Sequence, residues 1–310
     1  MNAITEKNKS KDHKPDVWVV VLNWNAFEDT HECLLSLQGV TYPNFQVVVV
    51  DNGSTDDSPQ QLNTYHPELS FVACETNRGI AAGYNRGIEF GLQAGADYVV
   101  VMNNDLIFDP DFLTEMVNTV QRWPKCGVVM PKIYYYDEPD IIWSTGGRTR
   151  WMPSNILLRD RQKQDDRSLQ TEEIIAFAPS CCLLITRELC QQVLFDESYF
   201  FYYDDWDFCL EARKDGWEIV FSPASRIWHK VSRSTQNSPK SLRWWKILGQ
   251  SCVRYHRKHH SLGLLATYVS WVLLREMIKG NFKSLPTFLR GIQLGLQAKT
   301  VDDMQPGWSV

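Results

Sequence analysis

The sequence predicts an α/β fold in which helices flank a mainly parallel β-sheet, followed by a C-terminal helical extension. From Val17 onward, short valine-rich runs alternate with longer segments of helical pattern, as in strands joined by crossover helices. The valine runs are nearly continuous, so both faces of the sheet should be covered. The 310-residue chain is 44% hydrophobic, which is enough for a substantial core.

The first part of the chain gives alternating strands and helices. Runs of β-branched residues with polar ends predict strands at 17–23, 45–52, 70–74 and 98–105. The longer segments between and after them predict helices at 27–38, 58–65, 79–95 and 111–122. Parallel strands need such crossovers, because a tight hairpin can join only antiparallel neighbours.

The second part is less regular. A strand is predicted at 126–136, but residues 137–173 are rich in Gly, Pro, Trp and charge and predict a long functional or disordered loop. Order resumes with a strand and helix at 174–193, a helix beginning near residue 204 and a strand at 218–230. Three regions are therefore expected: a disordered leader (1–15), an α/β domain (16–235) and a C-terminal helical region (236–310).

Composition and charge exclude several classes of protein. A net charge of -5 argues against a nucleic-acid-coating protein, so no nucleic-acid partner is expected. The eight cysteines show no disulfide or zinc spacing, which favours a reducing, cytoplasmic location. The N-terminus has no apolar core of a signal peptide, and no run reaches the length of a membrane-spanning helix.

Every strand of the first part ends in polar residues. These are Asn23 and Asn25, Asp51 and Asn52, Asn77 and Arg78, and Asn103 to Asp105. Each ending alone is explained by a turn, since Asn and Asp favour turns. Ligands of open α/β sheets, however, bind beyond the carboxyl ends of the strands. Four polar endings at one edge therefore favour a shared binding site.

The second of these endings, "DNGSTDD", suits a nucleoside. Asp51 and Asn52 can offer acceptors and donors to a base or ribose, and Gly53 allows a close approach of the backbone. The segment has neither the GxGxxG of dinucleotide folds nor the glycine-rich P-loop. Phosphates would therefore have to be neutralised elsewhere.

The fourth ending, Asn103-Asn104-Asp105, is the candidate for that task. A carboxylate at a strand end can bind Mg²⁺ or Mn²⁺ and leave positions for diphosphate oxygens. One carboxylate makes a weak site, and a turn would explain the segment equally well. His229 would strengthen the metal hypothesis if the fold places it beside Asp105.

A second acidic group lies in "FYYDDWDFC", where Asp204, Asp205 and Asp207 stand among aromatic residues. An apolar setting raises a carboxyl pKa and suits a general base. Helix capping by Asp204 is the structural alternative. The aromatic side chains themselves are expected to offer a surface for a sugar ring.

Taken together, five ordered blocks resemble the family 2 glycosyltransferases, inverting enzymes of the GT-A fold, and especially their rhamnosyltransferase-like bacterial branch. Four segments carry the five blocks, because the third segment contains two of them. The segments are "VVVLNWNAFEDTHECLLSL", "YPNFQVVVVDNGSTDDS", "TNRGIAAGYNRGIEFGLQAGADYVVVMNNDLIFDPDFL" and "FDESYFFYYDDWDFCLEARKDGWEIVFSPASRIWHK". They cover roughly residues 17–234.

The resemblance implies a role for each matching position. Asn23 and Asn25 fall at a nucleotide contact, Asp51 and Asn52 at the base and ribose, and Asn77 and Arg78 at the donor side. Asn103 and Asn104 then precede Asp105 in the metal motif, with His229 as a further ligand. Asp204 and Asp205 match the acidic pair, whose second member acts as base. Departures include Asn-Asn-Asp in place of a more acidic metal motif, and "PSCCLL" where relatives have glycine before the acceptor side.

The implied activity is an inverting, metal-dependent transfer of a sugar from dTDP-rhamnose or a UDP-sugar to a saccharide or lipid-linked glycan, in cell-surface polysaccharide synthesis. A sugar-1-phosphate nucleotidyltransferase is an alternative, although "LNWNAFED" lacks its glycine- and arginine-rich loop. A non-catalytic nucleotide- or carbohydrate-binding module is the other.

The C-terminal region allows two interpretations. "LGLLATYVSWVLL" (262–274) beside "RYHRKHH" suits an interfacial helix attracted to anionic lipid at the inner face of the cell membrane. A helical appendage packed on the domain, or a dimer interface, is equally compatible with the pattern. The oligomeric state stays open.

Overall fold

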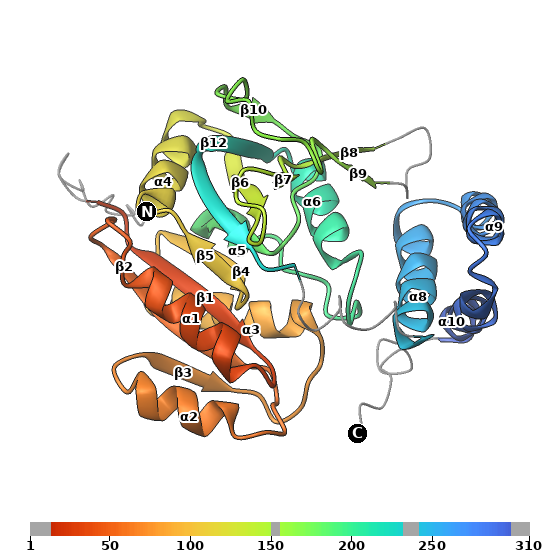
Figure 1. Cartoon of the computed structure of the whole chain (residues 1–310), viewed down its shortest axis with the longest axis horizontal. Coiled ribbons are helices and arrows are strands. Elements are labelled where there is room, and N and C mark those ends of the chain that lie inside the picture. The colour runs from red at the N-terminus through yellow and green to blue at the C-terminus, as the bar shows by residue number, and fades with distance from the viewer. Residues whose placement is uncertain (1–13, 150–155, 232–241, 299–310) are drawn as a thin grey trace, which may run out of the picture.

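The computed structural model describes residues 14–149, 156–231 and 242–298. Its centre is a ten-stranded sheet in the order β10-β12-β6-β11-β4-β1-β2-β3, with β5 paired to β12 and β7 to β6. Helices lie on both sides of this sheet (Figure 1). The predicted α/β architecture is confirmed.

The first half of the sheet follows the predicted alternation closely. The strands are β1 (Val17–Asn23), β2 (Phe45–Asp51), β3 (Ser70–Ala73) and β4 (Tyr98–Asn103), and the helices are α1 (Phe27–Leu37), α2 (Ser58–Tyr65), α3 (Ile80–Gln93) and α4 (Phe112–Arg122). β1 pairs in parallel with both β2 and β4, and β2 with β3. Asn23 lies opposite Asp51, so the polar endings meet at one edge, as predicted.

Helix α3 lies unusually close to β1 because glycines line its inner face. A Cβ at Gly83 would meet the Leu22 side chain at 2.3 Å, and one at Gly87 would meet Val20 at 2.1 Å. Only glycine leaves room for this approach. The close packing holds the start of α3 against the polar ends of β1 and β2.

The second half of the sheet is mixed rather than parallel. β11 (Cys182–Thr186) runs antiparallel between β4 and β6 (Cys126–Tyr135), while β12 (Glu218–His229) runs parallel to β6. β5 (Leu106–Phe108) pairs antiparallel with the end of β12, which brings His229 opposite Leu106. A short helix, α5 (Arg187–Cys190), follows β11, and α6 (Asp204–Lys214) precedes β12.

The segment predicted as one long loop contains short strands. They are β7 (Ile142–Ser144), β8 (Gly147–Thr149), β9 (Ile156–Leu158) and β10 (Glu173–Ile174). β7 and β10 extend the main sheet, and β8 and β9 form a separate two-stranded sheet. The prediction of a continuous loop at 137–173 is therefore wrong for these stretches, whose strands are too short to give a clear periodic pattern.

The C-terminal region is helical, as predicted. It comprises α8 (Leu242–His259), α9 (Leu262–Ile278), a short 3₁₀ turn η1 (Phe282–Ser284) and α10 (Leu285–Gln297). α8 lies between the sheet domain and the outer helices α9 and α10 (Figure 1). α8 and α10 touch through glycine, since a Cβ at Gly291 would meet the Lys246 carbonyl oxygen at 2.1 Å.

Within the described ranges, no helix combines the length and apolar character needed to cross a membrane. Most of the predicted leader (residues 1–13), and the predicted boundary between residues 235 and 236, lie outside the described residues.

Candidate active site

The carboxyl ends of β1, β2 and β4 are joined by one hydrogen-bonded network. The Asn23 amide donates to Asp51 Oδ1 at 2.9 Å, and Thr30 Oγ1 donates to Asn23 Oδ1 at 2.8 Å. The Asn104 amide in turn donates to Thr30 Oγ1 at 2.7 Å. Asn23 is fully buried, and its amide also donates to Ser54 and Ser58, so its side chain acts on any ligand only through such neighbours.

The ends of β2 and β3 are joined in a similar way. The Asn52 amide donates to the Gly79 carbonyl at 2.9 Å and lies 3.2 Å from Asn77 Oδ1. Gly53 has a φ of +71°, and a Cβ there would meet the Asn77 backbone nitrogen at 2.6 Å. The close approach predicted for Gly53 is thus an approach to the neighbouring loop.

Asn25 and Arg78 lie at the rim of this network, where both are exposed. Asn25 adopts a left-handed φ of 50°, and its Oδ1 accepts from the Thr55 backbone N–H at 2.7 Å. Arg78 lies 3.7 Å from a Glu197 carboxylate oxygen. Both side chains therefore help to shape loops that border the strand ends.

Asp105 and His229 are brought together by the pairing of β5 with β12. His229 Nε2 lies 3.1 Å from Asp105 Oδ1, and the backbone N–H of Lys230 donates to the Asp105 carbonyl at 3.0 Å. Lys230 is anchored on α1 by ion pairs with Asp29 and Glu32. The fold therefore places His229 beside Asp105, as the metal hypothesis required.

The Asp105–His229 pair fits a divalent ion. Adjacent ligands of an octahedral ion at about 2.1 Å stand about 3 Å apart, close to the separation of these two atoms. Among the described residues no group of three or more His, Cys, Asp or Glu side chains forms a complete metal cage. A two-ligand site leaves most positions for water and diphosphate oxygens, the usual arrangement for Mg²⁺.

The second acidic group begins helix α6. Its N-cap is Tyr203, which has a left-handed φ of 67°, and Tyr202 before it has a φ of 64°. Asp204 and Asp205 follow in the first helical turn, so Asp204 is not the N-cap. Consecutive left-handed tyrosines are costly and cluster at functional sites. Here they direct the chain sharply into the acidic pair.

The surroundings of Asp204 and Asp205 favour their protonated forms. Burial raises the pKa of both carboxyls above the usual aspartate range, and the charge on Asp204 raises the pKa of Asp205 further. Hydrogen bonds from the backbone N–H groups of Trp206 and Ser180 to Asp205 oppose this rise. Asp204 is only 3% exposed, whereas Asp205 keeps partial access to solvent. Asp205 is therefore the member of the pair that a ligand can reach.

Tyr84, a residue that sequence reasoning missed, links the two acidic groups. Its hydroxyl lies 2.8 Å from Asn103 Oδ1 and 2.9 Å from the Ser180 carbonyl oxygen. Ser180 also bonds to Asp204 through its hydroxyl. The only local signal was a tyrosine inside a helix otherwise rich in Gly and Ala. The C-terminal end of β4 and the N-terminal end of α6 thus belong to one continuous site.

Asp207 and two aromatic residues of its cluster, Tyr203 and Trp206, have structural roles. Asp207 is buried, and its carboxylate lies 2.7 Å from Lys258 Nζ and 2.6 Å from His259 Nε2, both on α8. Tyr203 and Trp206 are also buried and pack near Tyr255 of the same helix. The prediction that this cluster offers a sugar surface is wrong for these side chains, because α8 covers them.

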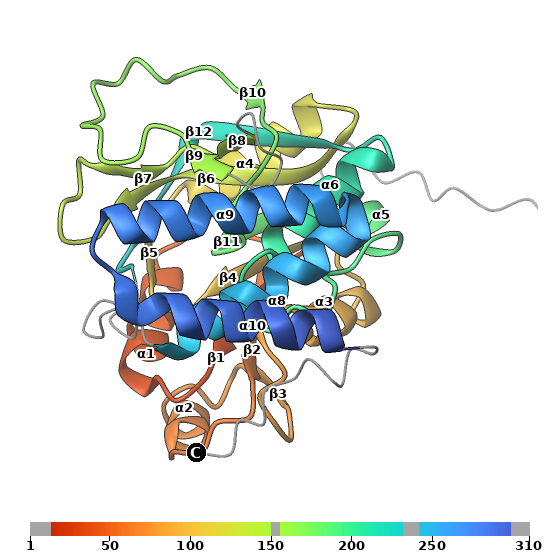
Figure 2. The ribbon, with the colours of Figure 1, turned by 90° about the vertical axis from the view of Figure 1, so that its right-hand side faces the viewer.

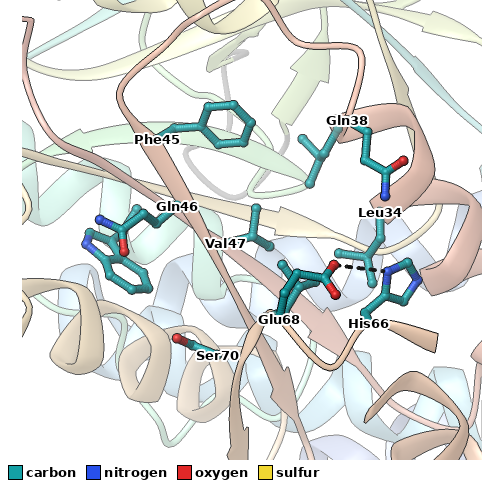
Figure 3. Close-up of a pocket in the computed structure, with 11 residues that line it drawn as sticks. Leu34, Gln38, Phe45, Gln46, Val47, His66, Glu68 and Ser70 are labelled. Atoms are coloured by element: carbon teal, nitrogen blue, oxygen red, sulfur yellow. Dashed lines mark ion pairs between the residues drawn. The ribbon is translucent and has the colours of Figure 1, made fainter. Parts of the chain in front are cut away.

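A cavity of about 310 Å³ lies at the opposite end of the strands. Phe45, Gln46 and Val47, the first residues of β2, line it together with Ser70 at the start of β3 and the His66–Glu68 pair (Figure 3). None of the strand-end residues described above contributes to it. It is therefore separate from the candidate active site.

Comparison with known proteins places the chain in a family. Residues 18–194 match the family described as Glycosyl transferase family 2. The chain is 29% identical over 248 residues to N-acetylglucosaminyl-diphospho-decaprenol L-rhamnosyltransferase of Mycobacterium tuberculosis, covering 72% of this chain and 78% of the relative. It is 26% identical over 235 residues to the amylovoran biosynthesis glycosyltransferase AmsB of Erwinia amylovora, covering 73% and 74% of the two chains.

Solved structures share the fold at low sequence identity. The mannosyltransferase PcManGT of Pyrobaculum calidifontis, in complex with GDP-Man and Mn²⁺, has a TM-score of 0.53 at 17% identity and covers 94% of this chain and 92% of its own. GalNAc-T7 with UDP, GalNAc and Mn²⁺ has a TM-score of 0.58 at 13% identity, covering 76% and 48%. These likenesses confirm the predicted GT-A fold.

The family match spans more than half of the chain. It includes the polar residues at the ends of β1, β2 and β4, among them Asp105. The chain therefore belongs to glycosyl transferase family 2 and is a glycosyltransferase of glycan or polysaccharide synthesis.

Proposed function

We propose that the chain is an inverting, metal-dependent glycosyltransferase. It would move a sugar from dTDP-rhamnose or a UDP-sugar to a hydroxyl of a saccharide or lipid-linked glycan, in the assembly of a cell-surface polysaccharide. The observation that carries the proposal is the link made by Tyr84 and Ser180 between the Asp105 side and the Asp205 side of the site. Inversion needs a base on one side of the anomeric carbon and a stabilised leaving group on the other.

The strand-end network is proposed as the nucleotide site. Asp51 and Asn52 hold the base and ribose, while Asn23 and Asn25 fix the loops that present them. Asn77 and Arg78 border the donor sugar, and Asn103 and Asn104 shape the turn before Asp105. Each of these amide contacts orders the site before the donor arrives, which lowers the entropic cost of binding.

Asp105 and His229 would hold Mg²⁺ or Mn²⁺, and the ion, when bound, would neutralise charge on the departing diphosphate. Asp205 would take the proton of the acceptor hydroxyl as that oxygen attacks the anomeric carbon. Its raised pKa, caused first by burial, makes it a stronger base than an ordinary aspartate. Asp204, buried beside it and bonded to Ser180, keeps that pKa high and the side chain in place.

The names of relatives support the choice of substrates. The mycobacterial relative is named as a rhamnosyltransferase acting on a diphospho-decaprenol acceptor, and the Erwinia relative as an enzyme of amylovoran biosynthesis. The two solved structures named above hold a nucleotide and Mn²⁺. A nucleotidyltransferase finds no comparable support in these relatives.

A thermal-shift panel tests the donor class. We expect one of UDP, dTDP or GDP to raise the unfolding temperature when Mn²⁺ or Mg²⁺ is present, and little shift in EDTA. Saturation at a hundred times Kd adds about 2.7 kcal/mol to the unfolding free energy, which is a shift of several degrees.

The matching nucleoside monophosphate serves as the control, because it lacks the second phosphate. The proposed diphosphate site would be refuted by equal shifts with the mono- and diphosphate, or by no shift with any of the three diphosphates.

A further inference from the structure

The outward face of helix α9 carries no charge. In this 17-residue helix only Arg275 and Glu276 are charged, and neither is exposed. The exposed side chains are Leu262, Leu264, Ala266, Thr267, Ser270, Leu274, Met277 and Ile278. A helix on a water-covered surface normally turns charged residues outward. This face therefore has the composition of a surface that contacts something apolar.

The apolar character continues into the turn between α9 and α10. Ile278 is 78% exposed and Phe282 is 62% exposed, and the exposed lysines Lys279 and Lys283 stand beside them. We call residues 277–283 the apolar-basic tip. A cavity of about 710 Å³ opens at this tip, lined by Leu242, Trp245, Phe282 and Lys283 among others. Figure 2 shows α9 and α10 crossing the outer end of the molecule, joined at the tip.

The charge of this region is opposite to that of the chain. Residues 242–298 contain nine Lys and Arg residues but one acidic residue, Glu276, whereas the chain as a whole has a net charge of -5. The Glu276 carboxylate is buried and is bonded to Arg275 and Asn281. The C-terminal helices thus form a basic, apolar unit on an acidic protein.

We propose that the outer face of α9 and the apolar-basic tip dock on an anionic lipid bilayer. Ile278, Phe282 and Leu274 would enter the boundary between headgroups and acyl chains, and Lys279 and Lys283 would meet lipid phosphates. A second copy of the chain fits this face less well. A two-fold dimer builds its interface from the same residues on both copies, so it would bring no exposed acidic group to Lys279 and Lys283. Anionic lipid supplies the missing complementary charge.

Helix α8 connects this membrane-facing unit to the acidic pair. The Arg254 guanidinium reaches both Asp196 carboxylate oxygens, at 3.1 and 3.2 Å, and Lys258 reaches Asp207 at 2.7 Å. Ser251 Oγ donates to the Phe201 carbonyl at 3.0 Å, four residues before Asp205. Docking would therefore fix the Asp205 side of the site relative to the bilayer surface.

Vesicle sedimentation tests the proposal on the full chain. Equimolar phosphatidylcholine and phosphatidylglycerol vesicles should bind the parent protein, whereas pure phosphatidylcholine vesicles should bind it about tenfold more weakly or worse. Added salt should release it. The charge variant Lys279→Glu with Lys283→Glu, and separately the apolar variant Ile278→Ser with Phe282→Ser, should each lower the partition coefficient about tenfold.

The matched control is Leu35→Ser with Lys125→Glu, which alters an exposed leucine and an exposed lysine of the sheet domain and should bind like the parent. Unfolding temperatures of all variants check that they are folded. Equal vesicle binding by parent and both tip variants would overturn the proposal. So would a dimer, seen by light scattering, that both tip variants abolish while vesicles bind nothing. The vesicles hold neither donor nor acceptor, so either failure leaves the proposed transferase activity standing.

Discussion

Asp205→Asn should slow sugar transfer severely while leaving nucleotide binding almost unchanged. Removal of a general base costs about 10²–10⁴ in rate, and this residue stands at the start of α6 rather than at the ends of β1 and β2, where the base and ribose are proposed to bind. We expect kcat to fall about a thousandfold and the Kd of the nucleoside diphosphate to stay within about twofold. Steady-state rates and calorimetric titration of the same preparation give both values.

The same variant should be more stable than the parent at neutral pH. Burial and the Asp204 charge raise the pKa of Asp205, so the folded chain holds its proton to a higher pH than the unfolded chain does. The unfolding free energy therefore falls as pH rises from the ordinary aspartate pKa through the raised value. Asparagine cannot ionise, so the variant should not lose unfolding free energy in this way. Urea unfolding at several pH values should show that the unfolding free energy of the variant declines less steeply with pH than that of the parent.

Asp215→Asn is the matched control, because it makes the same change at the exposed C-terminal end of the same helix. It should retain parent activity and parent stability. Normal transfer by Asp205→Asn would move the base elsewhere, with Asp204 next in line. The pH profile adds a further check, since kcat/KM should rise as a carboxyl with a raised pKa loses its proton.

Asp105→Ala should remove the metal-dependent part of nucleotide binding together with turnover. Asp105 supplies the only carboxylate of the proposed two-ligand site, and a bound metal ion contributes several kcal/mol to charge stabilisation. We expect Mn²⁺ to tighten nucleoside diphosphate binding to the parent but not to the variant. Turnover should fall by a factor of about a hundred or more. Calorimetry with and without Mn²⁺, followed by donor-turnover assays, measures both effects.

Asp137→Ala, which removes an exposed carboxylate outside the site, should behave like the parent. His229→Ala should weaken metal dependence less than Asp105→Ala, because a neutral imidazole ligand is lost in place of an anionic one. Full activity of the parent protein in EDTA would rule out the metal role of Asp105.

Much of the fold was predictable because its signals are local. Strands β1, β2 and β4 are valine runs that end in Asn or Asp, and parallel strands joined by helices must bring those ends to one edge. The register of Asn23 with Asp51 confirms this inference. The strand end and the acidic-aromatic segment pointed to Asp105 and to the Asp204–Asp205 pair, and the family resemblance then selected Asp205 as the base; the roles of both residues stay predictions.

The remaining features depend on pairing between distant segments. His229 reaches Asp105 only because β12 pairs with β5, and no sequence pattern near either residue predicts that pairing. Tyr84 connects Asn103 to Ser180 only after β11 has inserted beside β4. Tyr203 and Trp206 of the aromatic cluster were misread for the same reason. Their side chains suit a sugar ring when only the sequence is considered, but α8, which begins some 40 residues later, covers them.

The most direct test of the proposed inverting transfer is the stereochemistry of its product. The donor identified by the nucleotide panel can be incubated with Mn²⁺ and the protein without acceptor, so that water takes the acceptor's place. Proton NMR then records the first-formed anomer of the released sugar before mutarotation. An inverting enzyme should release a sugar of configuration opposite to that of the donor, and this release should be lost in Asp205→Asn. A first-formed sugar of retained configuration would contradict it.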